Sequence, residues 1–131
     1  MSNDRYVFVY GTLRRGQTND IHRYEPEPQF VADAVIAGQL YHLGGYPGAR
    51  LDGEGWVHGE VYAISSALEA QLDVLEEVSP VPTGEYTRQM RVVHVQGRDL
   101  TCLVYEIAID RVRAAPQLLH GDWLRRDEME D

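Results

Sequence analysis

The sequence predicts an α+β fold, in which a mixed or antiparallel sheet curls into a small β-barrel and packs against one main α-helix. Two observations support this prediction. Several short stretches alternate between apolar and polar residues, and a single stretch has both the periodicity and the start signal of a helix. Short strands with one good helix are typical of such curled sheets. The 131 residues, 44% of them hydrophobic, fit one domain over 1–131.

Five stretches are predicted to be strands because their residues alternate. They are residues 5–10, 31–43, 56–64, 86–95 and 101–109, and the second is expected to be interrupted near Gly38. The last two are joined by residues 96–99, Gln-Gly-Arg-Asp, which is typical of a hairpin connection. These two strands are therefore expected to be antiparallel neighbours.

One helix is predicted to begin at Ser66. Ser66 and Glu69 have capping-box spacing, in which each side chain bonds the backbone amide of the other residue. Three leucines at helical spacing form a buried stripe, and two prolines mark the end of the helix. The stripe is Leu68, Leu72 and Leu75, and the prolines are Pro80 and Pro82. Residues 116–126 are expected to add one or two helical turns.

The charge balance and the lack of long apolar runs exclude several classes of function. Twelve Lys and Arg residues against 21 Asp and Glu residues give a formal net charge of −9, which argues against nucleic-acid binding. No apolar run is long enough to span a membrane, and the N-terminus lacks a signal-peptide core. A cytoplasmic protein without a membrane partner is therefore expected. The acidic residues 127–131 are expected to fray.

The sequence predicts neither a metal nor a cofactor. The five histidines lack metal-ligand spacing, and no Walker motif or Gly-x-Ser-x-Gly motif is present. Cys102 is the only cysteine and lies in a predicted strand, so it is expected to be a small buried residue rather than a nucleophile. A monomer or a weak homodimer is expected.

The most informative stretch is Tyr10-Gly11-Thr12-Leu13, where an apolar strand stops at a glycine. A glycine leaves no side chain in the way of a ligand, and successive backbone amides in such a turn can bind an anion. The next two residues are arginines, which would add positive potential unless they point to solvent. By itself the stretch fits a carboxylate or phosphate site, and equally an ordinary turn at the end of a strand.

Several motifs together resemble the γ-glutamylcyclotransferase-like (AIG2-like) family. Tyr10-Gly-Thr-Leu-Arg14 resembles the N-terminal signature of that family. Leu72-Asp-Val-Leu-Glu76, followed by Tyr86-Thr-Arg88, resembles its Leu-Asp-x-x-Glu and Tyr-x-Arg pattern. The Gly-Thr-Leu form is most similar to the γ-glutamylamine cyclotransferase branch. The resemblance covers most of the chain, since further similar segments lie at 38–47, 59–62 and 121–123.

This resemblance implies an enzyme that uses no cofactor and no metal. Its reaction would be an intramolecular aminolysis of a γ-glutamyl amine or γ-glutamyl amino acid, giving 5-oxoproline and a free amine. By resemblance, Glu76 would act as general base and then as general acid. The resemblance also implies that Tyr10, Gly11, Thr12 and Leu13 bind this small-molecule substrate.

Tyr86 and Arg88 lie on one face of their predicted strand, because strand side chains alternate, and are candidates to line the same pocket. A structural role is the alternative for each of these residues. Glu76, at the edge of the leucine stripe, could pair with Arg88 or Arg91, and Tyr86 could belong to an apolar wall. The alternative functions are a non-catalytic protein that senses a small metabolite in this pocket, and an interaction protein whose motifs serve only the fold. Further candidates to line the pocket are Tyr46 and Tyr105.

Overall fold

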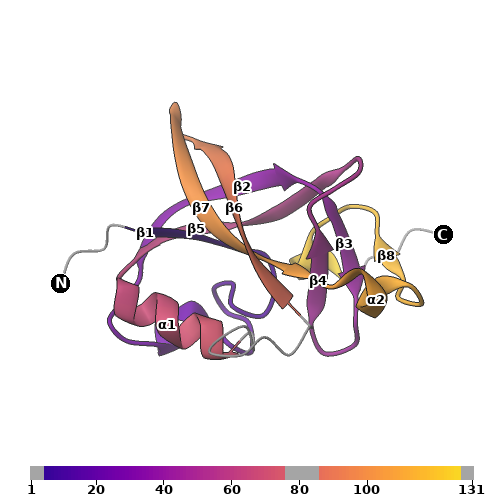
Figure 1. Ribbon diagram of the computed structural model, residues 1–131, viewed down its shortest axis with the longest axis horizontal. Helices are drawn as coiled ribbons and strands as arrows, with labels where there is room; N and C mark the ends of the chain where they lie inside the picture. The colour runs from indigo at the N-terminus through magenta and orange to yellow at the C-terminus, as the bar shows by residue number, and fades with distance from the viewer. Residues whose placement is uncertain (1–4, 76–85, 128–131) are drawn as a thin grey trace.

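The computed structural model describes residues 5–75 and 86–127 of the chain. Long strands run across the molecule, with α1 at one end and β3, β4, β8 and α2 at the other (Figure 1). The elements in chain order are β1 (Arg5–Val9), the 3-10 turn η1 (Ile21–Arg23), β2 (Gln29–Ala37), β3 (Gln39–His42), β4 (Pro47–Arg50), β5 (Trp56–Ile64), α1 (Ser66–Leu75), β6 (Tyr86–Val95), β7 (Arg98–Ile107), α2 (Ile109–Val112), β8 (Gln117–Leu118) and the 3-10 turn η2 (Trp123–Arg125).

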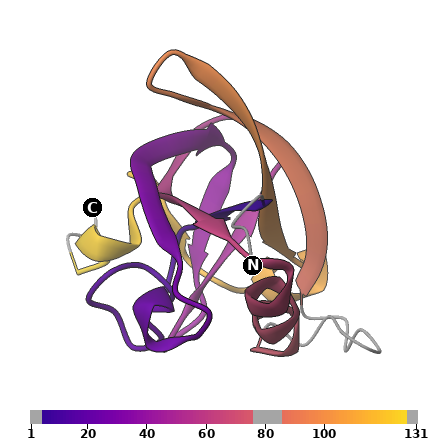
Figure 2. The ribbon, with the colours of Figure 1, turned by 90° about the vertical axis from the view of Figure 1, so that its left-hand side faces the viewer.

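Within the described residues, the larger sheet has five strands in the order β2-β5-β1-β7-β6. Neighbouring strands are antiparallel except β1 and β7, which are parallel and in register at Val7 and Leu103. The sheet is therefore mixed, as predicted. It curves into an open half-barrel rather than a closed barrel, because the outer strands β2 and β6 contact each other without pairing (Figure 2).

The β6–β7 hairpin confirms the predicted antiparallel pair. Its turn consists of Gln96 and Gly97, and Val95 pairs with Arg98 directly beside it. Both turn residues have a positive φ, 50° at Gln96 and 76° at Gly97, which matches the twist of the two strands. Because this turn is so tight, pairing continues up to Arg98, and β7 begins earlier than its predicted start at residue 101.

Helix α1 is capped by Ser65, so the predicted capping box of Ser66 and Glu69 is wrong. Ser65 Oγ accepts a hydrogen bond of 3.1 Å from the amide of Leu68. The carboxylate of Glu69 does not return to Ser66, because it forms ion pairs with arginines of β1 and β6. Ser65 was one residue away from the predicted cap, and the tertiary ion pairs of Glu69 explain the difference.

The predicted leucine stripe is buried over its first two members. Leu68 and Leu72 are fully buried among apolar residues of the sheet, whereas Leu75 is 36% exposed. Pro80 and Pro82, predicted to mark the end of the helix, lie outside the described residues.

A second, three-stranded sheet has the order β4-β3-β8 within the described residues. Its strand β3 falls inside the predicted strand 31–43, whereas β4 and β8 were not predicted as strands. Both are short, and β4 begins Pro47-Gly48, so neither alternation nor composition reveals them. Gly38 separates β3 from β2, which confirms the predicted interruption. A Cβ at Gly38 would lie 2.6 Å from the carbonyl oxygen of Arg50, so this crossing needs glycine. Residues 116–126 form β8 and the single turn η2.

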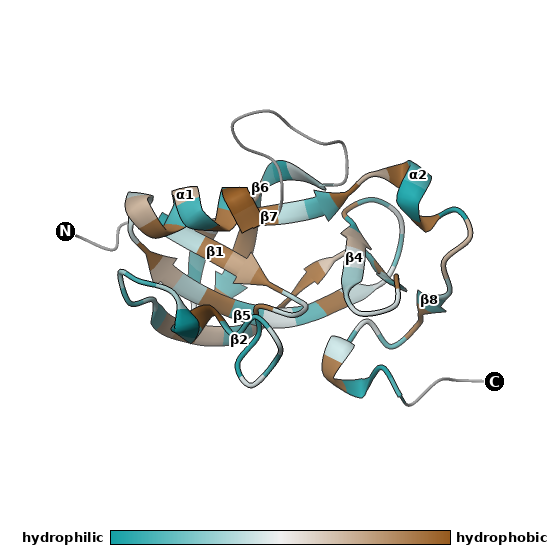
Figure 3. Cartoon of the chain, turned by 90° about the horizontal axis from the view of Figure 1, so that it is seen from below, coloured by the Kyte–Doolittle hydropathy of each residue, from teal (hydrophilic) through white to brown (hydrophobic). Residues whose placement is uncertain are grey.

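Both faces of the larger sheet are covered by apolar side chains. Along β1, which is hydrophobic over most of its length (Figure 3), Val7 and Val9 belong to one cluster and Phe8 to the other. Helix α1 packs on the cluster that contains Val7 and Val9, through Leu68 and Leu72. The end of β1 therefore lies at a fixed position beside α1. In the described part of the chain, no helix is both long enough and apolar enough to cross a membrane.

Candidate active site

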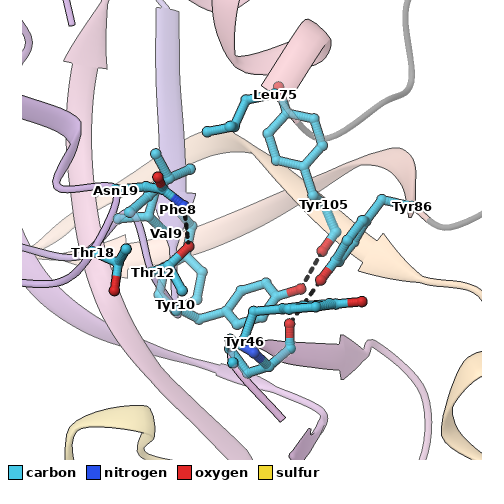
Figure 4. A pocket seen from close by; sticks show the side chains of 14 residues that line it. Phe8, Val9, Tyr10, Thr12, Thr18, Asn19, Tyr46, Leu75, Tyr86 and Tyr105 are labelled. Atoms are coloured by element: carbon cyan, nitrogen blue, oxygen red, sulfur yellow. Dashed lines mark hydrogen bonds between the residues drawn. The ribbon is translucent and has the colours of Figure 1, made fainter. Parts of the chain in front are cut away.

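A cavity of about 310 Å³ lies where β1 ends. Its walls come from the end of β1 and the loop that follows, the start of β4, the strands β6 and β7, and the end of α1 (Figure 4). The described lining residues are Phe8, Val9, Tyr10, Gly11, Thr12, Leu13, Thr18, Asn19, Gly45, Tyr46, Pro47, Leu75, Tyr86 and Tyr105.

The loop after β1 is fixed by hydrogen bonds to its carbonyl groups. The amide of Arg14 donates to the Gly11 carbonyl at 3.0 Å, and the amide of Asn19 donates to the Thr12 carbonyl at 2.9 Å. The Asn19 side-chain amide also donates to Thr12 Oγ1 at 3.1 Å. Among the described residues, the amides of Gly11, Thr12 and Leu13 have no backbone acceptor outside the regular strands. These bonds fix the loop through its carbonyls, and a turn with successive amides is a candidate to bind an anion.

Gly11 lets this loop contact β4. A Cβ at Gly11 would lie 2.4 Å from Pro47 Cγ, closer than real Cβ atoms approach a neighbour. The glycine predicted to leave room for a ligand thus makes room for a proline of the protein itself.

Hydrogen bonds between the phenol groups and the protein fix the tyrosines of the cavity wall. Tyr10 Oη donates to the carbonyl of Tyr105 at 2.6 Å and accepts from the Ala49 amide at 3.1 Å. Tyr86 Oη donates to the Pro47 carbonyl at 2.8 Å. These bonds cross between strands far apart in the sequence, so β1, β4, β6 and β7 hold one wall in common.

Behind this wall, ion pairs connect the sheet to α1. Tyr105 Oη donates to Asp73 Oδ1 at 2.7 Å, and Arg88 bonds the other oxygen of Asp73. Arg88 also bonds Glu69, which pairs with Arg5 at 2.9 Å. Burial disfavours the charged Arg88 guanidinium, but the two carboxylates outweigh this effect and raise its pKa. Arg88 therefore stays charged and holds α1 against β6.

The structure brings most of the predicted binding residues together. Tyr10, Gly11, Thr12, Leu13 and Tyr86 all line the cavity, and whether they bind substrate stays a prediction. Arg88 is not among the described lining residues; its two carboxylate partners turn it towards α1.

Glu76, the predicted general base, lies outside the described residues. The residue before it, Leu75, lines the cavity.

Arg14 does not supply positive potential to the loop. Its guanidinium is buried and forms ion pairs with Glu60 at 3.1 Å and Asp122 at 2.9 Å. Arg15 stacks its guanidinium over the ring of Phe30, 5.0 Å from the ring centroid. Both arginines therefore act within the fold, and the loop offers its backbone amides instead.

Sequence reasoning missed part of the cavity. Thr18 and Asn19 line the cavity but were not predicted. They lie in a region without periodicity, and their polar side chains are the only signal that the sequence offers. Tyr46 and Tyr105, named from the sequence only as further candidates, do line the cavity. Asp73 was also not named, although it is part of the Leu-Asp-x-x-Glu motif. In the structure it forms an ion pair with Arg88 of the Tyr-x-Arg motif. In residues 5–75 and 86–127, no three His, Cys, Asp or Glu side chains gather in a way that could hold a metal ion.

Comparison of the sequence with known protein families identifies the family of this chain. The γ-glutamyl cyclotransferase, AIG2-like family matches residues 7–125. The chain belongs to this family. The γ-glutamylcyclotransferase family protein YtfP of Escherichia coli is 39% identical over 123 residues, which cover 93% of this chain and 98% of YtfP. The solution NMR structure of YtfP covers the same shares with a TM-score of 0.63.

Two further members extend the comparison. The crystal structure of an AIG2-like protein from Mus musculus is 27% identical with a TM-score of 0.71, covering 90% of this chain and 86% of that one. The γ-L-glutamyl-butirosin B γ-glutamyl cyclotransferase of Niallia circulans is 44% identical over 73 residues, 54% of this chain and 45% of that protein. The family predicted from the motifs and the predicted fold class are confirmed, and membership supports a γ-glutamylcyclotransferase-type enzyme.

Proposed function

We propose that the protein converts a γ-glutamyl amide into 5-oxoproline and a free amine, with Glu76 as the proton carrier. The observation that carries this proposal is the convergence of the loop Tyr10–Leu13, Tyr86 and Leu75 on one cavity. These residues come from family motifs that lie far apart in the chain, at 10–14, 72–76 and 86–88. The residue directly after Leu75 is Glu76.

The reaction needs only proton transfer and a folded substrate. The α-amine nitrogen of the γ-glutamyl group bonds to its own γ-carbonyl carbon, and the bond from that carbon to the leaving nitrogen breaks. The α-ammonium loses one proton before attack and a second one as it becomes the lactam N–H. The departing nitrogen gains one proton as the bond breaks and another when the free amine becomes an ammonium. One carboxylate can carry these protons in turn, as base and then as acid, which contributes about 10²–10⁴-fold in rate.

The loop supports this chemistry by binding the substrate's α-carboxylate. Successive amides in such a turn suit an anion, and no ion pair from the buried Arg14 is required. Holding the carboxylate there while Glu76 accepts from the α-amine would bend the extended γ-glutamyl chain towards ring closure. Such pre-organisation supplies up to about 7–11 kcal/mol in well-oriented intramolecular reactions.

Two details of the named relatives favour a γ-glutamyl amide as the substrate class. YtfP is named a γ-glutamylcyclotransferase family protein, and the name of the Niallia circulans enzyme gives γ-L-glutamyl-butirosin B as the compound on which it acts. In this chain the cavity of about 310 Å³ has room for a small γ-glutamyl compound.

The test is to incubate the purified protein with γ-glutamyl amides and γ-glutamyl amino acids and to measure 5-oxoproline by mass spectrometry. Glu76→Gln should lose at least 10²-fold in turnover and still bind substrate, seen as thermal stabilisation. Glu54→Gln, an exposed glutamate outside the cavity, is the matched control and should keep full activity. Full activity in Glu76→Gln would contradict the assignment. Stabilisation by ligand without product from the unmodified protein would favour a metabolite sensor.

A further inference from the structure

We propose that the amine released by this enzyme carries an uncharged apolar group, best an aromatic ring, and carries no carboxylate. This inference rests on the proposed function and concerns the part of the cavity that would hold the leaving group. Three features support it: the separation of polar and aromatic side chains, the hydrogen bonds of the phenol groups, and the absence of charge from the described lining.

The cavity has a polar end and an aromatic end. Figure 4 shows Thr12, Thr18 and Asn19 together on one side and Tyr46, Tyr86 and Tyr105 on the other. A γ-glutamyl group carries a carboxylate and an amine, and the polar end with the loop amides suits both. The leaving group then extends from the γ-carbonyl towards the tyrosines.

The hydroxyl groups of Tyr10, Tyr86 and Tyr105 are engaged by the protein, which leaves their rings as the surface offered to a ligand. The hydroxyls of Tyr10 and Tyr86 are each donated to a backbone carbonyl, and that of Tyr105 is donated to Asp73. With these hydrogens engaged by the protein, the rings act as hydrophobic walls that favour stacked or edge-on aromatic contacts. Leu75 and Pro47 add further apolar surface.

No charged side chain belongs to the described lining of the cavity. Arg14 and Arg88, the arginines of the two family motifs, are both paired with carboxylates elsewhere. A second carboxylate on the leaving group, as in a γ-glutamyl amino acid, would therefore lose water without meeting an arginine. Such desolvation disfavours a charged group, whereas an apolar ring gains from the same burial.

Three substrates that differ by one group separate these effects: the γ-glutamyl amides of phenethylamine, ethylamine and phenylalanine. The phenethylamide adds only a phenyl group to the ethylamide and lacks only the carboxylate of γ-glutamylphenylalanine. We expect kcat/KM for the phenethylamide to exceed that for each of the other two by at least about tenfold.

A variant pair locates the effect in the tyrosine walls. Tyr46 is 38% exposed at the cavity, so Tyr46→Leu should fold normally and lower kcat/KM for the phenethylamide by a larger factor than kcat/KM for the ethylamide. Trp56, 62% exposed and outside the lining, gives the control Trp56→Leu, which should affect neither substrate.

The outcomes distinguish this inference from the proposed function. If none of the substrates yields 5-oxoproline, the proposed function itself fails. If 5-oxoproline forms but γ-glutamylphenylalanine or the ethylamide is used as well as the phenethylamide, the function stands and the inference is overturned. A preference for the γ-glutamyl amide of 1,4-diaminobutane, whose tail is cationic, would overturn it as well.

Discussion

The hydroxyl of Tyr105 donates a 2.7 Å hydrogen bond to Oδ1 of Asp73, which joins the wall of the cavity to helix α1. Arg88 of β6 binds the other oxygen of the same carboxylate. The Leu-Asp-x-x-Glu and Tyr-x-Arg motifs are therefore in physical contact through Asp73 and Arg88. A buried carboxylate with a charged partner and a phenol partner fixes the helix that leads directly to Glu76.

Replacing Asp73 by asparagine should loosen this connection. The asparagine side chain would keep one oxygen for Tyr105 but lose the ion pair, and Arg88 is open enough to turn partly to solvent. We expect the free energy of unfolding to fall by about 2 kcal/mol. Urea unfolding followed by circular dichroism measures the change. Asp110→Asn breaks a solvent-exposed pair with Arg113 and should change stability by less than about 0.5 kcal/mol. Equal effects of both variants would contradict a special role for Asp73.

Local patterns predicted the long elements well, and tertiary contacts explain what they missed. The strands β5 and β6 begin and end where the sequence predicts, because each is long and contains several strand-forming residues. The short β4 and β8 have no local signal, since pairing with β3 alone defines them. The sequence prediction placed the helix cap at Ser66, whereas the structure has it at Ser65. The arginines that attract Glu69 away from a capping box come from β1 and β6, which no local pattern reveals.

In the candidate site, too, local patterns identified some residues, and tertiary contacts explain the others. A strand ending at glycine identified the loop Tyr10–Leu13, and period-two spacing with the motif resemblance identified Tyr86. The same spacing placed Arg88 on the face of Tyr86. In the structure its guanidinium instead forms ion pairs with Glu69 and Asp73, which lie on α1. The sequence left open whether Arg14 and Arg15 add positive potential to the loop or point to solvent. It could not show that the carboxylates of Glu60 and Asp122 would take up Arg14.

Replacing Arg14 by methionine should be among the most damaging single changes in the fold. Glu60 is 2% exposed and also accepts hydrogen bonds from Tyr62 Oη at 2.7 Å and the Arg15 amide at 3.0 Å. Without Arg14 its carboxylate would remain buried without a cation, which costs about 3–5 kcal/mol. The midpoint of urea unfolding measures the loss. Arg113→Met removes an exposed arginine instead and should leave the midpoint almost unchanged. A loss below about 1 kcal/mol in Arg14→Met would show that Glu60 finds water or another partner.

Gly11→Ala should disturb both stability and catalysis. The added methyl group would lie 2.4 Å from Pro47 Cγ, so either the loop or β4 must move. Overpacking of this kind costs about 1–3 kcal/mol, and the same movement would displace the loop amides. We therefore expect a lower unfolding midpoint together with a lower kcat/KM for 5-oxoproline formation. Gly45→Ala is the steric control for stability, since its Cβ would meet no atom within 4 Å. An unchanged midpoint in Gly11→Ala would mean that Pro47 yields without cost.

Cys102 gives a prediction for alkaline pH. The thiol is fully buried in β7, and burial raises its pKa from 9.0 to about 11. Because the folded protein holds this proton more tightly than the unfolded chain, the contribution to stability is complete below pH 9. It is lost as the pH rises from 9 to 11, at up to about 1.4 kcal/mol per pH unit. Cys102→Ala removes the thiol, so its unfolding free energy should fall less steeply over that range.

Alkylation provides an independent check on the same thiol. At pH 8 a pKa near 11 leaves about one thiol in a thousand ionised, and the sulfur is also shielded from reagent. Iodoacetamide should therefore modify the folded protein at least about 10³-fold more slowly than the protein in urea. Rapid labelling of the folded protein would show that the strand pair β6–β7 opens. Identical pH dependence in Cys102→Ala would show that the thiol does not titrate as a buried group. Slow labelling together with the shallower slope would place Cys102 in the structural core of β7, apart from the chemistry of the cavity.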